Sequence, residues 1–233
     1  MPKTIATVEF EIPGHSDKYL SIDSDQSLLD YDIIVFTPEI RSLYGYSSES
    51  YKGKPCLNEQ DSFSLAEKAN RWRQELRSAF EHGKTVFIFM PEVQEVFVDS
   101  GNRNYSGTGR SRVTTKLVDA FNNYSLLPMS FTELVSARGR EIKPAQDLKF
   151  LGPYWKEFGA ASDYEVYFTS KSVSPLLVTK TGSKTVGGIV RDKAESARGA
   201  FILLPPVRYE AKEFTERKGS KAFWNKKGVA FGN

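Results

Sequence analysis

Two unbroken apolar runs on either side of one amphipathic segment constrain the fold of this chain more than any other feature. Ile33–Phe36 and Val86–Phe89 contain only apolar residues, which is typical of parallel strands covered on both faces. Between them, Asp61–His82 places apolar side chains at spacings of three and four and is followed by Gly83, which predicts a helix capped at Asp61 or Ser62. Strand, helix and strand with short connections form a βαβ unit, so both strands are expected to lie parallel in one sheet.

Further β-rich segments flank this unit. Thr4–Ile12 predicts a first strand, and a turn follows at Pro13-Gly14. Late in the chain, a turn at residues 180–184 joins two of a series of short strands, predicted at Tyr164–Thr169, Pro175–Thr179, Thr185–Val190 and Ala200–Leu204. We therefore expect a Rossmann-like or flavodoxin-like α/β fold, with a mostly parallel sheet, helices on both faces and late antiparallel strands.

The middle of the chain has weaker patterns. Ser100–Arg112 is rich in Gly, Ser, Asn and Arg and predicts a mobile surface loop. Val113–Tyr124 places Val113, Leu117, Val118 and Phe121 on one helical face and predicts a short helix. Residues 125–162 are expected to end in a packed helix that contains Tyr154, Trp155 and Phe158.

Composition narrows the class of protein. Of the 233 residues, 39% are hydrophobic and 26% are charged, which is ordinary for a globular protein and excludes collagen-like and disordered chains. No stretch reaches the ~18 apolar residues of a membrane span, and the N-terminus lacks the apolar region of a signal peptide. One cysteine and two histidines offer no disulfide and few metal ligands. We therefore expect a cytoplasmic protein with no membrane contact, metal or cofactor.

The positive charge is concentrated at the end of the chain. The formal net charge is +3, and residues 208–233 carry seven basic and three acidic residues. This predicts an α/β domain over residues 1–207 and a basic tail over 208–233. The tail contains Phe223–Phe231, which has the pattern of an amphipathic helix that is cut short, so we expect the chain to be a fragment or a shortened form of a longer protein.

Four residues are candidates for catalysis. Asp17, Glu39 and Glu92 follow predicted strands, and the carboxyl ends of parallel strands form the usual site of an open α/β sheet. These carboxylates could hold a metal or act as acid and base, or they could simply be solvated loop charges. Cys56 follows Lys52 and Lys54, which would lower a thiol pKa, with His15 as a conceivable base. The alternative is a small buried cysteine without chemistry.

Two further groups are candidates for binding. The loop at Gly107–Arg112 lacks the complete pattern of a phosphate-binding loop, yet its arginines could contact an anion or nucleic acid together with the tail. The candidates for that contact are Arg103, Arg110, Arg112, Lys226 and Lys227, and the alternative is a solvated loop. A tyrosine-rich stretch with Tyr44, Tyr46 and Tyr51 suits recognition of a partner, or packs on the sheet edge instead.

Three segments resemble the class I glutamine-amidotransferase-like superfamily. They are Ser27–Pro38 (SLLDYDIIVFTP), the helix containing Arg71–Leu76 with the strand Gly83–Phe89 that follows it, and Gly199–Pro206 (GAFILLPP). Active members place a cysteine after the third strand and a His-x-Glu pair late in the chain. Here Met90-Pro91-Glu92 follows that strand, and no histidine occurs after His82. The resemblance therefore implies a degenerate, non-catalytic member, similar to N-terminal domains of bacterial phage-defence proteins.

Three functions remain open from the sequence. The leading hypothesis is a non-catalytic interaction or sensing domain that binds a protein partner, either another subunit or the chain's own missing C-terminal region. The resemblance implies that such a domain is part of an antiphage defence protein. The first alternative is a metal-dependent or nucleotide-dependent hydrolase that uses the carboxylates at the sheet edge. The second is a nucleic-acid-binding protein that uses the basic loop and tail.

Overall fold

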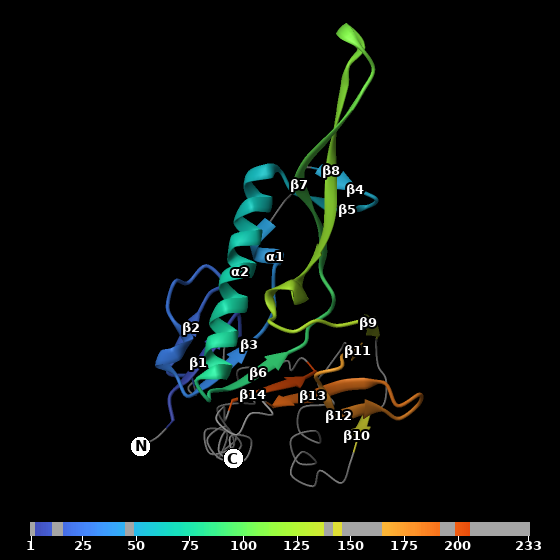
Figure 1. Cartoon of the computed structure of the whole chain (residues 1–233). Helices are drawn as coiled ribbons and strands as arrows, with labels where there is room; N and C mark the ends of the chain where they lie inside the picture. Colours follow the sequence, from blue (N-terminus) through green and yellow to red (C-terminus); the bar gives the residue numbers. More distant parts are fainter. Residues whose placement is uncertain are drawn as a thin grey trace, which may run out of the picture.

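A large mixed sheet forms the body of the molecule. The computed structural model describes residues 3–10, 16–44, 49–137, 142–145, 165–191 and 199–205. The sheet has eight strands in the order β10-β12-β13-β14-β6-β3-β1-β2 (Figure 1). In chain order they are β1 (Ile5–Val8), β2 (Lys18–Leu20), β3 (Ile33–Phe36), β6 (Thr85–Phe89), β10 (Ile142–Pro144), β12 (Ser174–Thr179), β13 (Thr185–Arg191) and β14 (Ala200–Leu204). The predicted strands before residue 91 and after residue 173 are thus confirmed.

The predicted βαβ unit is present, although residues 37–58, between its first strand and its helix, form a longer connection than expected. The helix α2 (Glu59–Glu81) connects β3 to β6, which pair in parallel with Ile34 opposite Val86. Its N-cap is Asn58, whose side chain accepts a hydrogen bond from the backbone N–H of Asp61, so the helix begins before the predicted cap. At its other end, Gly83 takes a φ of +78°, which suits glycine at a helix terminus.

The parallel and antiparallel parts of the sheet meet at β14. This strand pairs in parallel with β6 and antiparallel with β13, with Ile202 opposite Phe87 on one side and Ile189 on the other. The parallel part continues through β3, β1 and β2, while β13, β12 and β10 pair antiparallel. The expected late antiparallel strands are therefore confirmed, and the fold is a mixed α/β fold.

Both faces of the central strands are buried. In β3, Ile34 and Phe36 pack with α2 residues in one apolar cluster, whereas Ile33 and Val35 belong to a second cluster on the opposite face. The first cluster includes Trp72, whose indole N–H donates to the carbonyl of Ile22 at 2.8 Å. Among the described residues a long helix covers only this first face, so the expected helical layers on both faces are not confirmed.

A second sheet contains a long β-hairpin that projects from the body. Its order is β4-β5-β7-β8, with β4 (Glu49–Tyr51), β5 (Lys54–Cys56), β7 (Glu95–Ser106) and β8 (Val113–Asn122). Figure 1 shows β7 and β8 extending well beyond the end of α2. We call residues 100–117 the arm. The helix predicted at Val113–Tyr124 is therefore wrong, and so is the loop predicted at Ser100–Arg112, of which Ser100–Ser106 belong to β7.

Short elements complete the described part. They are η1 (Leu28–Asp30), α1 (Arg41–Tyr44), η2 (Gly109–Ser111), η3 (Asn123–Leu126) and the antiparallel pair β9 (Glu133–Ala137) and β11 (Glu165–Thr169). The turn at Pro13-Gly14, the helix expected near Tyr154 and the basic tail lie outside the described residues. No helix in the described ranges has the length and apolarity needed to cross a membrane.

Candidate functional site: the sheet edge and the arm

The carboxyl ends of β3 and β6 do bring two predicted carboxylates near each other. Both contact Arg41: the backbone N–H of Arg41 donates to Glu39 at 2.9 Å, and its guanidinium lies 3.4 Å from the Glu92 carboxylate. Because the side chains of Arg41 and Glu92 are 61% and 40% exposed, this ion pair contributes little to stability. The two carboxylates act here as partners of one arginine.

Two buried amides occupy the space beside these carboxylates. Gln94 donates to Glu39 at 2.6 Å and accepts from the backbone N–H of Ile40 at 3.0 Å. Asn123 accepts from the backbone N–H of Gln94 at 3.1 Å and donates to the carbonyls of Pro38 and Glu92 at 2.9 and 3.2 Å. Gln94 and Asn123 are 5% and 0% exposed. Since every one of these bonds joins parts of the chain, the amides serve to hold the ends of β3, β6 and β8 together.

Asp17 lies at the amino-terminal ends of the parallel strands, opposite the ends that carry Glu39 and Glu92, which corrects its expected position. It precedes β2, and β2 runs parallel to β1, so Asp17 stands beside the amino end of β1. Its carboxylate accepts a hydrogen bond from the backbone N–H of Ile5 at 2.7 Å. The structure therefore does not bring Asp17 to Glu39 and Glu92.

Cys56 is also separate from these carboxylates. It is 6% exposed and lies in β5 of the second sheet, opposite Glu49 and Phe97. His82 caps α2, with its ring Nδ1 2.7 Å from the carbonyl of Ser78, and His15 lies outside the described residues. The described ranges contain no group of three or more His, Cys, Asp or Glu side chains arranged to hold a metal.

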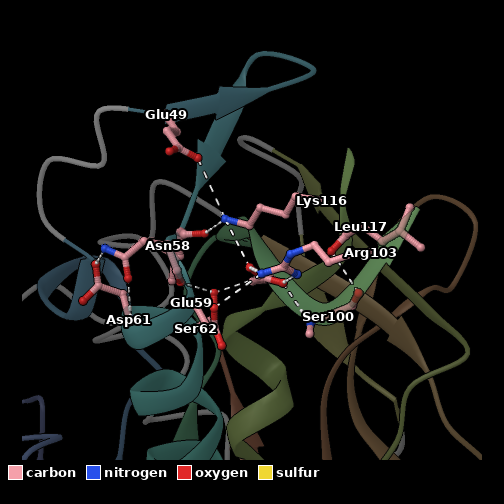
Figure 2. A network of polar contacts seen from close by, with 12 residues as sticks. Glu49, Asn58, Glu59, Asp61, Ser62, Ser100, Arg103, Lys116 and Leu117 are labelled. Carbon is pink, nitrogen blue, oxygen red and sulfur yellow. Dashed lines mark hydrogen bonds and ion pairs between the residues drawn. The ribbon is translucent and has the colours of Figure 1, made fainter. Parts of the chain in front are cut away.

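The base of the arm is fixed by a polar network that centres on Asp99. The guanidinium of Arg103 donates to both carboxylate oxygens of Asp99, at 2.7 and 3.0 Å, and lies 3.4 Å from Glu59. The ammonium of Lys116 is 3.6 Å from Asp99 and donates to the carbonyl of Leu57 at 2.8 Å. Figure 2 shows Arg103 and Lys116 pointing from the arm toward Glu49 and the first turn of α2.

Backbone contacts complete this network. The register between β7 and β8 shifts between Asp99 and Arg103, which marks a β-bulge. Within the bulge, the N–H of Gly101 donates to Asp99 at 2.8 Å, and the N–H of Asp99 donates to the hydroxyl of Ser62 on α2 at 2.8 Å. The bulge thus folds the strand around a carboxylate whose side chain is only 2% exposed.

These contacts shift the pKa values of Asp99 and Arg103. The hydrogen bonds from Arg103 lower the pKa of Asp99 more than its burial raises it, and the N–H of Gly101 lowers this pKa further. The pKa of Arg103 is raised, mainly by the same hydrogen bonds. Asp99 therefore stays ionised at neutral pH and holds the arm to α2.

Beyond this network, the arm presents two different faces. Arg103 and Tyr105 lie opposite Lys116 and Thr114, so these four side chains share one face, and the guanidinium of Arg112 stacks 4.3 Å from the centre of the Tyr105 ring. The other face is uncharged and consists of Asn104, Ser106, Val113, Thr115 and Leu117. On it, Val113 and Leu117 are 56% and 44% exposed.

The predicted basic contacts have different positions. Arg103 is held by Asp99, so its charge is already matched within the chain. Arg110 lies in η2 at the tip of the arm, and Arg112 follows it; both side chains are exposed. Lys226 and Lys227 lie outside the described residues. The structure therefore leaves the two arginines of the tip as cations available for contact.

The tyrosine-rich segment does not form one continuous surface among the described residues. Tyr51 lies in β4, is 43% exposed and meets the ring of Phe97 edge-on, with 4.8 Å between ring centres. Tyr44 is the last residue of α1, and Tyr46 lies outside the described residues. Three further exposed side chains, Tyr105, Val113 and Leu117, belong to the arm, and the sequence did not indicate them as contact residues.

No protein-family model matches the chain, and no curated protein matches it at a significant level. The amidotransferase-like resemblance therefore rests on the hydrophobic patterns of its three segments.

Proposed function

We propose that this protein is a non-catalytic interaction domain whose arm binds a partner protein. The observation that carries the proposal is the arm itself, a ribbon of two strands that projects from a firmly packed body and ends in exposed residues. An isolated two-stranded ribbon is marginally stable in water, so contact with a partner would stabilise it.

The uncharged face of the arm supports a protein partner. Cores of protein interfaces are depleted in charge, and this face combines Val113 and Leu117 with Asn104, Ser106 and Thr115. The ribbon also offers backbone hydrogen bonds. Beyond Phe97, the outer edge of β7 pairs with no other strand among the described residues, and β8 is the last strand of its sheet. An extended segment of a partner could therefore add to the ribbon as a further strand.

The amidotransferase-like resemblance is consistent with this proposal. It implies a domain that has lost the catalytic cysteine and histidine, and it favours a role in a bacterial antiphage defence protein. The buried amides support the same conclusion, because Gln94 and Asn123 fill the sheet edge where an open α/β enzyme would bind substrate. A hydrolase that uses Asp17, Glu39 and Glu92 gains no support from this arrangement.

Nucleic-acid binding is a second candidate that one observation favours. Between Ser100 and Val118 the sequence contains four basic residues and no acidic residue, and Arg110 and Arg112 are exposed at the tip. A two-stranded ribbon fits the major groove of duplex DNA, and guanidinium groups bind phosphates. Such binding would weaken steeply as salt concentration rises.

One cross-linking experiment tests both candidates. A photo-reactive amino acid is placed at Val113 on the uncharged face or, as a matched control, at Tyr19 on β2, which is 48% exposed. Each protein is irradiated in cells that naturally make it. The proposal expects a discrete protein adduct from Val113 only, and this adduct should disappear when Leu117→Asp is added to the same chain.

Other outcomes would reject the proposal. Adducts that nuclease removes and that increase at low salt would favour the nucleic-acid candidate. Equal adducts from both positions, or none from Val113, would show that the arm is not a contact surface. Metal-dependent hydrolysis that Glu39→Gln abolishes would restore the enzyme hypothesis.

A further inference from the structure

A cavity of about 560 Å³ opens between the C-terminal end of α2 and the strands β13 and β14. Residues 128–130 and Ser172 line its other side. Its volume lies within the range of roughly 300–1,000 Å³ that is typical of sites for small organic ligands. The cavity lies on the body of the protein and does not involve the arm.

The floor of the cavity is aromatic and well fixed. The rings of Phe80 on α2 and Phe201 on β14 stack with 4.8 Å between their centres and an angle of 2° between their planes. Val190 lies opposite Phe201 on the neighbouring strand and also lines the cavity. Gly199 allows this close packing, since a Cβ there would lie 2.0 Å from the carbonyl oxygen of Phe80. The floor is therefore apolar, and the close approach of Gly199 to the backbone of Phe80 fixes how α2 packs on β14.

The rim carries two arginines. Arg77 on α2 and Arg191 on β13 line the cavity, and neither guanidinium forms a hydrogen bond or ion pair in the part of the chain that the structure describes. One carboxylate, Glu81, lies on the same rim, so the rim has a net positive charge. Another cavity, next to β12 and β13, differs because its cation, Lys184, already contacts Glu133 at 3.3 Å and the Tyr167 ring.

We propose that this cavity binds a small organic anion with a flat apolar body. The apolar part would lie on Phe80, Phe201 and Val190, and the anionic group would bind Arg77 and Arg191. Guanidinium groups suit this role because they form paired hydrogen bonds with a carboxylate or sulfonate. The hydroxyls of Ser130 and Ser172 line the same cavity and provide further donors.

Two probes of matched shape test the charge requirement on the unmodified protein. 1-Naphthaleneacetate and its neutral amide have the same ring and about 14 non-hydrogen atoms each, so the acid should bind with a Kd on the order of 1 mM or tighter. Both are titrated against the bound fluorescent probe 8-anilinonaphthalene-1-sulfonate. We expect one saturable site for this probe, and displacement by the acid at a concentration about tenfold lower than by the amide.

Variants locate the site. Arg77→Gln and Arg191→Gln should each weaken binding of the acid about five- to tenfold, whereas Arg110→Gln at the tip of the arm should leave it unchanged. The proposal is overturned if the acid and the amide compete equally, if binding does not saturate or is absent, or if the Arg77 and Arg191 variants bind like the control. Circular dichroism confirms that each variant is folded, and the comparison of acid with amide holds without any variant.

Discussion

The carboxylate of Asp99 and the guanidinium of Arg103 form a bidentate ion pair, although the two residues lie four positions apart on the same strand, β7. Side chains four residues apart are common partners on a helix but lie too far apart on a regular strand. The β-bulge between them shortens this distance. The bend of β7 and the attachment of the arm to α2 therefore both depend on the contact between Asp99 and Arg103.

Asp99→Asn should loosen the arm and leave the body intact. The amide keeps the size of the side chain but removes the charge that Arg103 and Lys116 share. Amide hydrogen exchange should accelerate in residues 100–117, while β3 and β6 remain protected. Asp119→Asn, an exposed carboxylate on β8, is the control and should change neither region. Unchanged exchange in the Asp99 variant would contradict the role of the network.

Lowering the pH should also loosen the arm and leave the body intact. Because the folded protein lowers the pKa of Asp99, this pair stabilises the arm fully above the ordinary pKa of about 3.9. The stabilisation falls as the pH drops from there through the lowered pKa. Hydrogen exchange measured between pH 5 and pH 2, corrected for the intrinsic rate, should show the arm opening before the body. In Asp99→Asn this early step should be absent; if it persists, another group causes it.

Asn123→Ala should destabilise the whole body. The variant leaves buried backbone groups of Pro38, Glu92 and Gln94 without partners, which costs about 3 kcal/mol in the free energy of unfolding. Urea denaturation measures this loss. Asn104→Ala on the exposed face of the arm is the matched control, with an expected change within about 0.5 kcal/mol. Similar changes in both variants would show that the amide cluster has no special role.

Tyr124 should make the protein sensitive to alkali. The side chain is 3% exposed, its hydroxyl donates to the carbonyl of Pro91, and burial raises its pKa well above the usual value of 10. A raised pKa means that stability is complete below pH 10 and decreases as the pH rises from 10 toward the folded-state value. Thermal melts at pH 9 and pH 11 should show this decrease in the native protein and a smaller one in Tyr124→Phe. An equal decrease in both proteins would assign it to other groups.

Gly199→Ala should be more damaging than Gly188→Ala. The added methyl group at position 199 would meet the backbone carbonyl of Phe80 at 2.0 Å, and backbone in a helix yields little. At position 188 the nearest atom is a side-chain methyl carbon of Val173 at 2.2 Å, and the nearest backbone atom is the carbonyl oxygen of Ser174 at 3.0 Å. We expect a loss of about 1–3 kcal/mol for Gly199→Ala and a smaller loss for Gly188→Ala, measured by urea denaturation. The reverse order would contradict the close packing of α2 on β14.

The body was largely predictable because burial imposes a pattern. The apolar runs at β3 and β6 and the spacing in α2 follow directly from contact with a core on defined faces. The arm was not predictable by the same means. Neither of its faces is buried, so Ser100–Ser106 shows no apolar alternation.

The mistaken helix has a related cause. The apolar residues of Val113–Tyr124 match a helical period by chance, and pairing with β7 decides the structure. The β-branched run Val113-Thr114-Thr115 was a local signal for a strand.

The candidate site was also only partly predictable from the sequence. Glu39 and Glu92 were placed correctly at strand ends because the βαβ unit fixes where those ends lie. The roles of Gln94 and Asn123 were not predictable, because an uncharged amide has neither the charge nor the spacing pattern that marks a site in a sequence. Asp99 and Arg103 were missed as a pair because only a bulge brings residues at this spacing together in a strand.

The position of β14 has a consequence for synthesis on the ribosome. This strand lies between β6 and β13, so residues 200–204 must pair with residues 85–89, which are made more than a hundred residues earlier. Until then the edge of β6 that receives β14 is open, although β1, β3, α2 and β6 are already translated. A nascent chain therefore exposes an unpaired edge of β6 while residues 90–199 are being made, and an open strand edge of this kind favours association with other chains.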